Sequence, residues 1–236
     1  MRDWAMDSEL TTRLRAFVQD NHIQVDPHFV EYHSGVYGLV DCVFSAQVRY
    51  VVVQRALERL SARLPDHPEL TFQDFLDDVA RLGTEAYATE VLTRHRLGRR
   101  PGRLKVEVTL NAARFLLTHD FPTKASLQRL SSEGGKRLVL HDLVQEVQGI
   151  GPVLARYLLL LLGYEDHVKP DTLLTRLLSD VGGQPLRYGH PDDMAAIHEA
   201  VTVVARDLGT TPARLDNALW KYESTGRQPL LWRMQD

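Results

Sequence analysis

The chain has 236 residues, of which 44% are hydrophobic and 25% charged, and its net charge is −3. This is the composition of an ordinary soluble globular protein, long enough for one substantial core or two smaller lobes. The acidic balance alone argues mildly against nucleic-acid binding, for which a basic domain is usual. The longest apolar run, residues 157–162, is far shorter than the roughly 20 residues that cross a bilayer. The first residues contain no apolar signal segment, so we expect no membrane contact and a cytoplasmic location.

Helical periodicity dominates the first part of the chain. Apolar residues recur at helical spacing over 10–18, which predicts a first helix after a cap at Asp7 or Ser8. Residues 36–64 indicate one or two buried helices. The β-branched run Val51–Val53 lies inside that helical pattern, so we assign it to helix.

The middle of the chain predicts further helices separated by glycine or proline. They are a helix from its Thr71 cap to Gly83, one from Thr84 or Thr89 to the loop 98–102, one over 104–117, and a short one capped by Thr123 or Ser126. We expect Glu133–Gly135 to separate this short helix from the segment after Lys136. No alternating period-2 stretch is present, so the sequence predicts an all-α protein.

A helical hairpin is predicted around residue 150. A short helix over 140–147 leads into the turn Gly149-Ile150-Gly151, and Pro152 suits the first position of a second helix. That second helix is apolar on nearly every side, which places it at the centre of a bundle. Glycines let amides at its N-terminus approach a phosphate closely, whereas Ile150 would anchor the turn between the helices. The turn alone also fits a tight helical connection that binds nothing.

Asp171 begins another helix about twenty residues after the hairpin. A carboxylate at this position is usually an N-cap. Next to a DNA-docking hairpin it would instead face a sugar whose bond to the base is cleaved. The local sequence leaves both interpretations open.

Four segments together resemble the helix-hairpin-helix DNA glycosylase superfamily, which includes endonuclease III. They are Val43–Gln47, the hairpin residues Val147–Ala155, Val168–Leu173 around Asp171, and Leu215–Tyr222, in an order and spacing that fit the family over residues 36–225. The resemblance implies two helical lobes with a DNA-binding cleft. One is a helical barrel over 36–163 that contains the hairpin, and the other joins 1–35 to 164–236 and carries Asp171. It also implies a monomer that binds double-stranded DNA.

The resemblance implies roles for individual residues. Gln47 would enter the duplex near the vacated base, with Arg49 beside it, and the amides of Gly149, Gly151 and Val153 would bind phosphate. Basic side chains would add affinity for DNA. They are Lys136, Arg137 and the cluster Arg94, Arg96, Arg99, Arg100, Arg103 and Lys105. A charge run such as this cluster is more usually a solvated loop.

Asp171 would stabilise the cationic sugar or activate water, which is electrostatic catalysis by a carboxylate. Members of the superfamily that also cleave the strand carry a Schiff-base lysine where this chain has Val153, so the sequence resembles a monofunctional branch. Lys169 is a substitute for that Schiff-base lysine, a phosphate contact or a solvent-exposed charge.

The single cysteine, Cys42, excludes internal disulfides and the four-cysteine iron–sulfur cluster of endonuclease III. The ten histidines show no obvious ligand spacing. We therefore expect no metal cofactor, apart from a monovalent cation that the hairpin carbonyls could bind.

The sequence thus predicts a base-excision DNA glycosylase without lyase activity. The alternatives are a non-catalytic protein of the same fold that recognises abasic or distorted DNA, and an all-α interaction protein. The base that is excised is not evident from the sequence, because a base pocket draws side chains from several helices.

Overall fold

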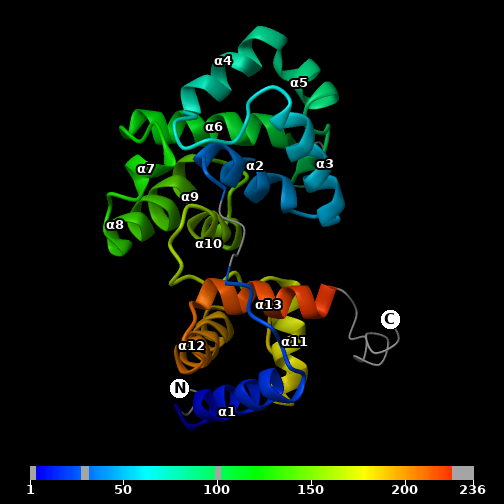
Figure 1. Cartoon of the computed structure of the whole chain (residues 1–236), viewed down its shortest axis with the longest axis vertical. Helices are drawn as coiled ribbons and strands as arrows, with labels where there is room; N and C mark the ends of the chain where they lie inside the picture. Colours follow the sequence, from blue (N-terminus) through cyan, green and yellow to red (C-terminus); the bar gives the residue numbers. More distant parts are fainter. Residues whose placement is uncertain (1–3, 28–31, 99–101, 225–236) are drawn as a thin grey trace. The chain divides into compact units, whose positions relative to one another are not determined.

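The structure is a computed structural model that describes residues 4–27, 32–98 and 102–224. The chain is helical nearly throughout, so it is an all-α protein as predicted (Figure 1). Within the described residues, the β structure is one short antiparallel ribbon of β1 (Arg96–Leu97) and β2 (Arg103–Leu104). No helix in these ranges is both long and apolar enough to span a bilayer. The chain divides into a terminal unit, Met1–Phe29 with Glu165–Asp236, and a central unit, Val30–Tyr164.

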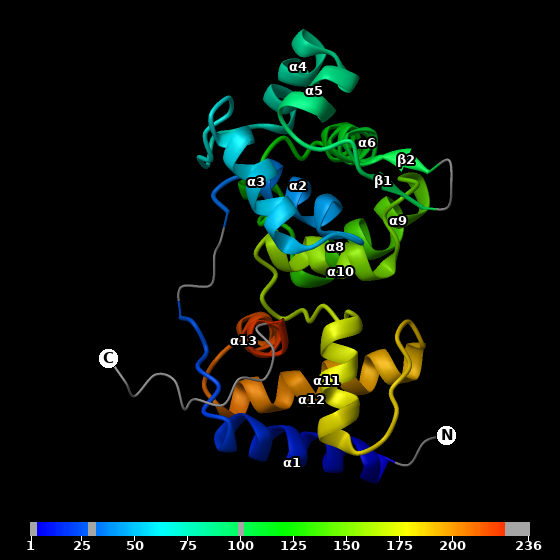
Figure 2. The same ribbon diagram turned by 90° about the vertical axis from the view of Figure 1, so that its right-hand side faces the viewer.

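The terminal unit is built from helices at both ends of the sequence. They are α1 (Trp4–Asp20), α11 (Thr172–Gly182), α12 (Pro191–Asp207) and α13 (Pro212–Ser224). Helix α1 packs against α11 and α12, and α13 packs against the same two helices (Figure 2). Each helix contributes fully buried side chains to one core, such as Leu14, Leu178, Val201 and Leu219.

The central unit contains the remaining elements. Its helices are α2 (Gly35–Ser45), α3 (Tyr50–Ser61), α4 (Phe72–Leu82), α5 (Thr84–Glu90), α6 (Lys105–Thr118), α7 (Lys124–Leu127), α8 (Ser132–Lys136), a π-helix η1 (Arg137–Leu143), α9 (Val144–Glu146) and α10 (Pro152–Leu161). Helix α10 packs against α2 and the π-helix, and α6 packs against α2 and α4 (Figure 1). The leucines of α10 from Leu158 onward are buried, as expected for a central helix.

Several predicted helix ends are confirmed. The Thr71 side chain accepts a hydrogen bond from the Asp74 amide at 3.0 Å, and Gly83 ends α4 with a φ of +87°. Val51–Val53 lie within α3. Thr123 caps α7. At Thr71, Gly83 and Thr123 a short polar side chain or a glycine satisfies a local requirement of the helix end.

Three expectations were wrong. Helix α1 already includes Trp4, so Asp7 and Ser8 lie inside it and do not cap it. The helix after Gly83 ends at Glu90, and the ribbon β1–β2 follows it. Gly134 and Gly135 do not break the chain but lie inside α8, which continues directly into the π-helix.

A close packing contact explains why residue 135 is a glycine. A Cβ atom on Gly135 would lie 2.4 Å from the Cζ atom of Tyr164, whose hydroxyl donates to the Leu127 carbonyl at 2.8 Å. Gly135 therefore allows the tyrosine ring to rest against the helix backbone. The low helix propensity of glycine is outweighed by this close contact.

Replacing these two glycines separately should give opposite results. Gly134→Ala should leave stability unchanged or raise it by up to about 1 kcal/mol, because its Cβ would be 3.4 Å from Leu130 and alanine favours helix. Gly135→Ala should lower the free energy of unfolding by about 1–3 kcal/mol, because the new methyl overlaps the ring of Tyr164. Urea denaturation followed by circular dichroism measures both. Equal effects of the two variants would contradict this explanation.

Candidate functional site

The two glycines of the hairpin have different structural roles. Gly149 has a φ of +109°, and a Cβ atom there would lie 2.9 Å from Cγ2 of Val108. Ile150 is 3% exposed and anchors the turn, as expected. Gly151 has an ordinary φ of −91° and no atom within 4 Å of a Cβ position. The fold therefore requires a glycine at 149, whereas the missing side chain at 151 leaves open space.

That open space lies at the N-terminus of α10. Gly151 is the N-cap residue, Pro152 is the first helical residue, and the Ala155 amide makes a backbone bond to the Gly151 carbonyl at 3.0 Å. Amides of a first helical turn, here those of Val153 and Leu154, have no partner within their helix. Gly151 supplies no capping side chain. Such a helix start favours an anion through both its amides and its dipole.

Gln47 occupies a strained turn between α2 and α3. Its φ is +59°, which is uncommon for a residue with a side chain, and both Gln47 and Arg49 are exposed. The buried ammonium of Lys105 holds this turn by donating to the carbonyl of Phe44 at 2.9 Å and to that of Ala46. These carbonyls end α2, where the helix dipole favours a cation. Burial lowers the pKa of Lys105 to about 8.

The expected basic cluster is therefore smaller than the sequence indicates. Lys105 is 1% exposed and serves the α2 turn, so it is not a surface cation. Arg96 and Arg103 are exposed, and the Arg103 guanidinium donates to the side chain of Gln148 in the hairpin. Arg94 pairs with Glu85 at 3.4 Å. Arg99 and Arg100 lie outside the described residues.

The start of α6 connects the candidate DNA-binding loops of the central unit. Lys105 contacts the turn that carries Gln47, and Val108 contacts Gly149. Arg103, just before α6, contacts the hairpin at Gln148. Lys136 lies on α8, where its ammonium pairs with Glu133 at 2.9 Å.

A buried carboxylate in the central unit was not predicted. Asp41 on α2 is 1% exposed and accepts hydrogen bonds from the hydroxyls of Tyr32 at 2.6 Å, Tyr50 at 3.0 Å and Tyr157 at 2.9 Å. Burial and the Asp41 charge raise the pKa of all three phenols. The signal in the sequence is an aspartate inside an otherwise apolar helix. Because this network is internally hydrogen-bonded, we interpret it as structural.

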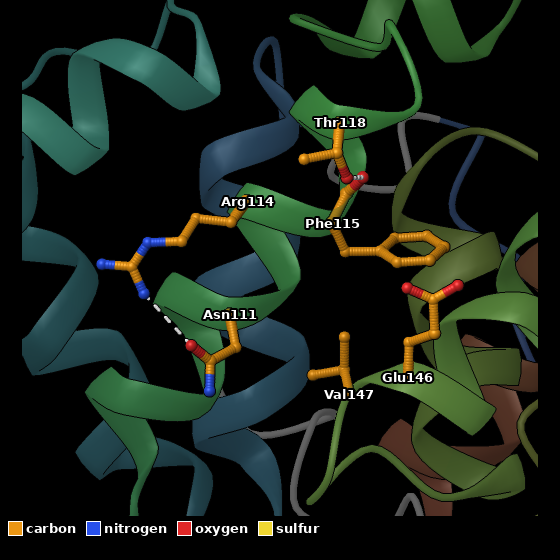
Figure 3. A pocket seen from close by; sticks show the side chains of 6 residues that line it. All are labelled: Asn111, Arg114, Phe115, Thr118, Glu146 and Val147. Atoms are coloured by element: carbon orange, nitrogen blue, oxygen red, sulfur yellow. Dashed lines mark hydrogen bonds between the residues drawn. The ribbon is translucent and has the colours of Figure 1, made fainter.

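A shallow hollow of about 250 Å³ lies between α6 and α9. Figure 3 shows Phe115 of α6 pointing toward Glu146 and Val147, which precede the turn Gly149-Ile150-Gly151. The Arg114 guanidinium turns back and donates to the Asn111 side-chain oxygen at 3.1 Å. None of the predicted site residues lines it.

Asp171 lies in the terminal unit as the N-cap of α11. Its Oδ1 atom accepts hydrogen bonds from the amides of Leu173 and Leu174, both at 2.9 Å. Both bonds use the same oxygen, so the capping role does not employ Oδ2. The expected N-cap is confirmed, and one carboxylate oxygen remains for another role.

A second carboxylate holds the segment that leads to Asp171. Asp216 on α13 is 5% exposed, and its Oδ2 atom accepts a hydrogen bond from the Lys169 amide at 2.6 Å. The pKa of Asp216 is raised to about 7, chiefly by burial; the hydrogen bond from the Lys169 amide opposes this rise, and the charge of Asp171 adds to it. Asp216 lies in the segment Leu215–Tyr222 that carries the resemblance, but the sequence predicts no role for it, because the amide from which it accepts is 47 residues away along the chain.

Within the described residues, no three His, Cys, Asp or Glu side chains are placed so that they could hold a metal ion. The central unit carries Gln47, Arg49, Lys136 and the hairpin Gly149–Val153, and the terminal unit carries Lys169 and Asp171.

Solved structures share this fold. The 3-methyladenine DNA glycosylase (Mag1) of Schizosaccharomyces pombe, in complex with abasic DNA, has a TM-score of 0.60 and 16% identity over 95% of this chain and 98% of its own. The 8-oxoguanine DNA glycosylase of Thermotoga maritima has a TM-score of 0.52 and 18% identity over 94% and 98% of the two chains. The 8-oxoguanine glycosylase/lyase of Methanocaldococcus jannaschii, in complex with DNA containing 8-oxoguanine, has a TM-score of 0.53 and 17% identity over 98% and 94%. The chain thus has the helix-hairpin-helix DNA glycosylase fold.

The sequence itself matches one family model. It is described as "Domain of unknown function (DUF8548)" and matches residues 8–224. The chain therefore belongs to this family. No curated protein matches the sequence.

The buried acid should make stability depend on pH. The pKa of Asp216 is about 7 in the folded chain and 3.8 when exposed, so the folded state binds the proton more tightly. The protonated Asp216 therefore contributes to the stability of the fold at low pH, and this contribution is lost as the pH rises from about 4 to about 7. Relative to Asp216→Asn, the wild type should lose about 3 kcal/mol of unfolding free energy between pH 5 and pH 8. Urea titrations at both values measure this loss. A constant difference between the two proteins would contradict it.

Proposed function

We propose that this member of the DUF8548 family is a base-excision repair DNA glycosylase that hydrolyses the N-glycosidic bond of a damaged or mispaired base in double-stranded DNA. The observation that carries the proposal is the open N-terminus of α10 at Gly151, in a chain that also presents the Asp171 carboxylate at the start of α11. The fold shared with known DNA glycosylases supports it.

The hairpin would dock on the DNA backbone. The amides of Gly151 and Val153 would bind a phosphate at the helix start, a contact that is independent of base sequence and suits an enzyme that scans DNA. Arg103 beside the hairpin and Lys136 on α8 would add attraction for neighbouring phosphates. Gln47 would fill the gap left by the extruded nucleotide, with Arg49 beside it, because its strained turn presents an exposed side chain.

Asp171 would supply the catalytic charge. Two backbone amides fix Oδ1, so the carboxylate is held in one orientation while Oδ2 is available to a developing cationic sugar or to a water that attacks C1′. Val153 occupies the position that the resemblance assigns to a Schiff-base lysine and has no amine to form an imine. The reaction is therefore hydrolysis without strand cleavage. It requires water and no cofactor, and a monomer would suffice.

Asp171→Asn tests the chemistry without removing the cap, because asparagine caps helices about as well as aspartate. Wild-type protein would be incubated with duplexes that carry uracil, an oxidised pyrimidine, an alkylated purine or a mispaired adenine. We expect alkali-labile sites from at least one lesion. The variant should form them at least 100-fold more slowly, since it loses a preorganised charge at the transition state.

Three other outcomes of this assay are informative. Tight binding of abasic DNA without release of any base would favour a non-catalytic DNA-binding protein. Equal rates for wild type and Asp171→Asn would contradict the role of Asp171. Strand breaks that form without alkali, together with a covalent protein–DNA adduct that appears when borohydride reduces an imine intermediate, would replace the hydrolytic mechanism by a lyase if Lys169→Ala abolishes both.

The hairpin glycines offer a matched pair for DNA binding. Gly151→Ala should lower stability by less than about 1 kcal/mol, because its φ is ordinary and the space is open. It should nevertheless weaken binding of an abasic duplex by about tenfold, because the methyl occupies the phosphate approach. Gly149→Ala should instead cost at least about 2 kcal/mol of stability, from its positive φ and the clash with Val108. Unchanged affinity of a folded Gly151→Ala variant would contradict hairpin docking.

A further inference from the structure

A buried side chain and two hydrogen bonds from backbone amides hold the segment before Asp171. The side chain of Val168 is fully buried in the core of the terminal unit. The Lys169 amide donates to Asp216 at 2.6 Å, and the Asp171 amide donates to the Lys169 carbonyl at 2.7 Å. Pro170 has no N–H, and Asp171 uses its own N–H within this turn. The hydrogen bond from the Lys169 amide therefore ties this turn to α13.

A carboxylate is an expensive acceptor at this position. Asp216 is 5% exposed, so its ionised form carries a desolvation cost that a neutral acceptor of the same hydrogen bond would not. The charged groups that act on it are those of Asp171 and Lys169. Partial burial and, after it, the charge of Asp171 raise the pKa of Tyr188, which is 51% exposed. Residues that break a general packing rule often serve a site nearby.

We propose that Asp216 is a positioning residue for Asp171, which it orients by holding the Lys169 amide. This inference rests on the proposed function, in which the Asp171 carboxylate faces a cationic sugar. Asp216 itself touches neither DNA nor the reacting atoms. It acts through the turn 169–171, which sets where α11 begins and therefore where the Asp171 carboxylate lies.

The test needs no knowledge of the excised base. One duplex carries a pyrrolidine abasic analogue whose protonated ring nitrogen mimics the cationic sugar, and a matched duplex carries a neutral tetrahydrofuran analogue. The ratio of the two dissociation constants measures the contribution of a correctly placed carboxylate. General destabilisation would weaken both complexes and leave the ratio unchanged. Wild type should prefer the cationic duplex, and Asp171→Asn should lose that preference.

Variants of two buried acids on α13 provide the comparison. Asp216→Ala should reduce the preference at least tenfold, and Asp216→Leu should do the same while filling the space, which keeps the test valid if the alanine variant does not fold. Asp216→Asn retains an oxygen that accepts the Lys169 amide, so it should keep the preference within threefold. Glu223→Ala is the matched control, because Glu223 is 7% exposed and its carboxylate pairs with Arg176 of α11 at 2.7 Å. It should leave the ratio unchanged.

The outcomes separate the two proposals. If wild type shows no preference for the cationic duplex, the catalytic role of Asp171 fails, and the positioning role fails with it. If wild type shows the preference and folded Asp216→Leu retains it, the positioning role alone is overturned. An equal loss in Glu223→Ala would also overturn it, because any damage to α13 would then have the same effect.

Discussion

The hydrogen bonds from the buried ammonium of Lys105 to the end of α2 are the interaction on which the candidate DNA-binding loops of the central unit depend. Moving a lysine into the interior costs free energy, and this cost lowers its pKa to about 8. Two carbonyls at the end of α2 offset part of the cost and fix the turn that presents Gln47. One turn further along α6, Val108 packs against Gly149. A single helix end thus positions both loops, so a shift of α6 would move them together.

In the terminal unit two aspartates hold the turn before α11 and the start of that helix by hydrogen bonds to the backbone. The Lys105 ammonium holds the α2 turn of the central unit in the same way. Asp171 satisfies two orphan amides of α11 with one oxygen, which combines helix capping with a free carboxylate edge. Asp216 accepts a hydrogen bond from the amide of Lys169, two residues before Asp171, and burial raises the pKa of Asp216. The two units therefore share one principle. In each unit a buried ionisable group fixes an irregular turn by hydrogen bonding to its backbone, at a cost in desolvation.

The sequence predicted those features that local rules govern. Thr71, Gly83, Pro152 and Asp171 were placed correctly because caps and turns depend on one residue and its neighbours. Gly135 was misread as a break, because the ring of Tyr164 that requires it lies 29 residues away in the sequence and beyond any local rule. Lys105 looked like a surface cation for the same reason, since its acceptors lie about 60 residues earlier. Long-range contacts decide such positions, and one sequence does not show them.

The net charge of −3 constrains how such a protein would hold DNA. A domain without an overall positive field gains little from long-range attraction, which screening reduces further at physiological salt. Under the proposed function, affinity would have to come from short-range contacts, chiefly the amides at the start of α10 and a few arginines such as Arg103. Amide contacts add no net charge and release fewer counterions than lysine or arginine contacts do. Discrimination would then depend on how well a distorted duplex fits the hairpin and the Gln47 turn, rather than on general attraction to DNA.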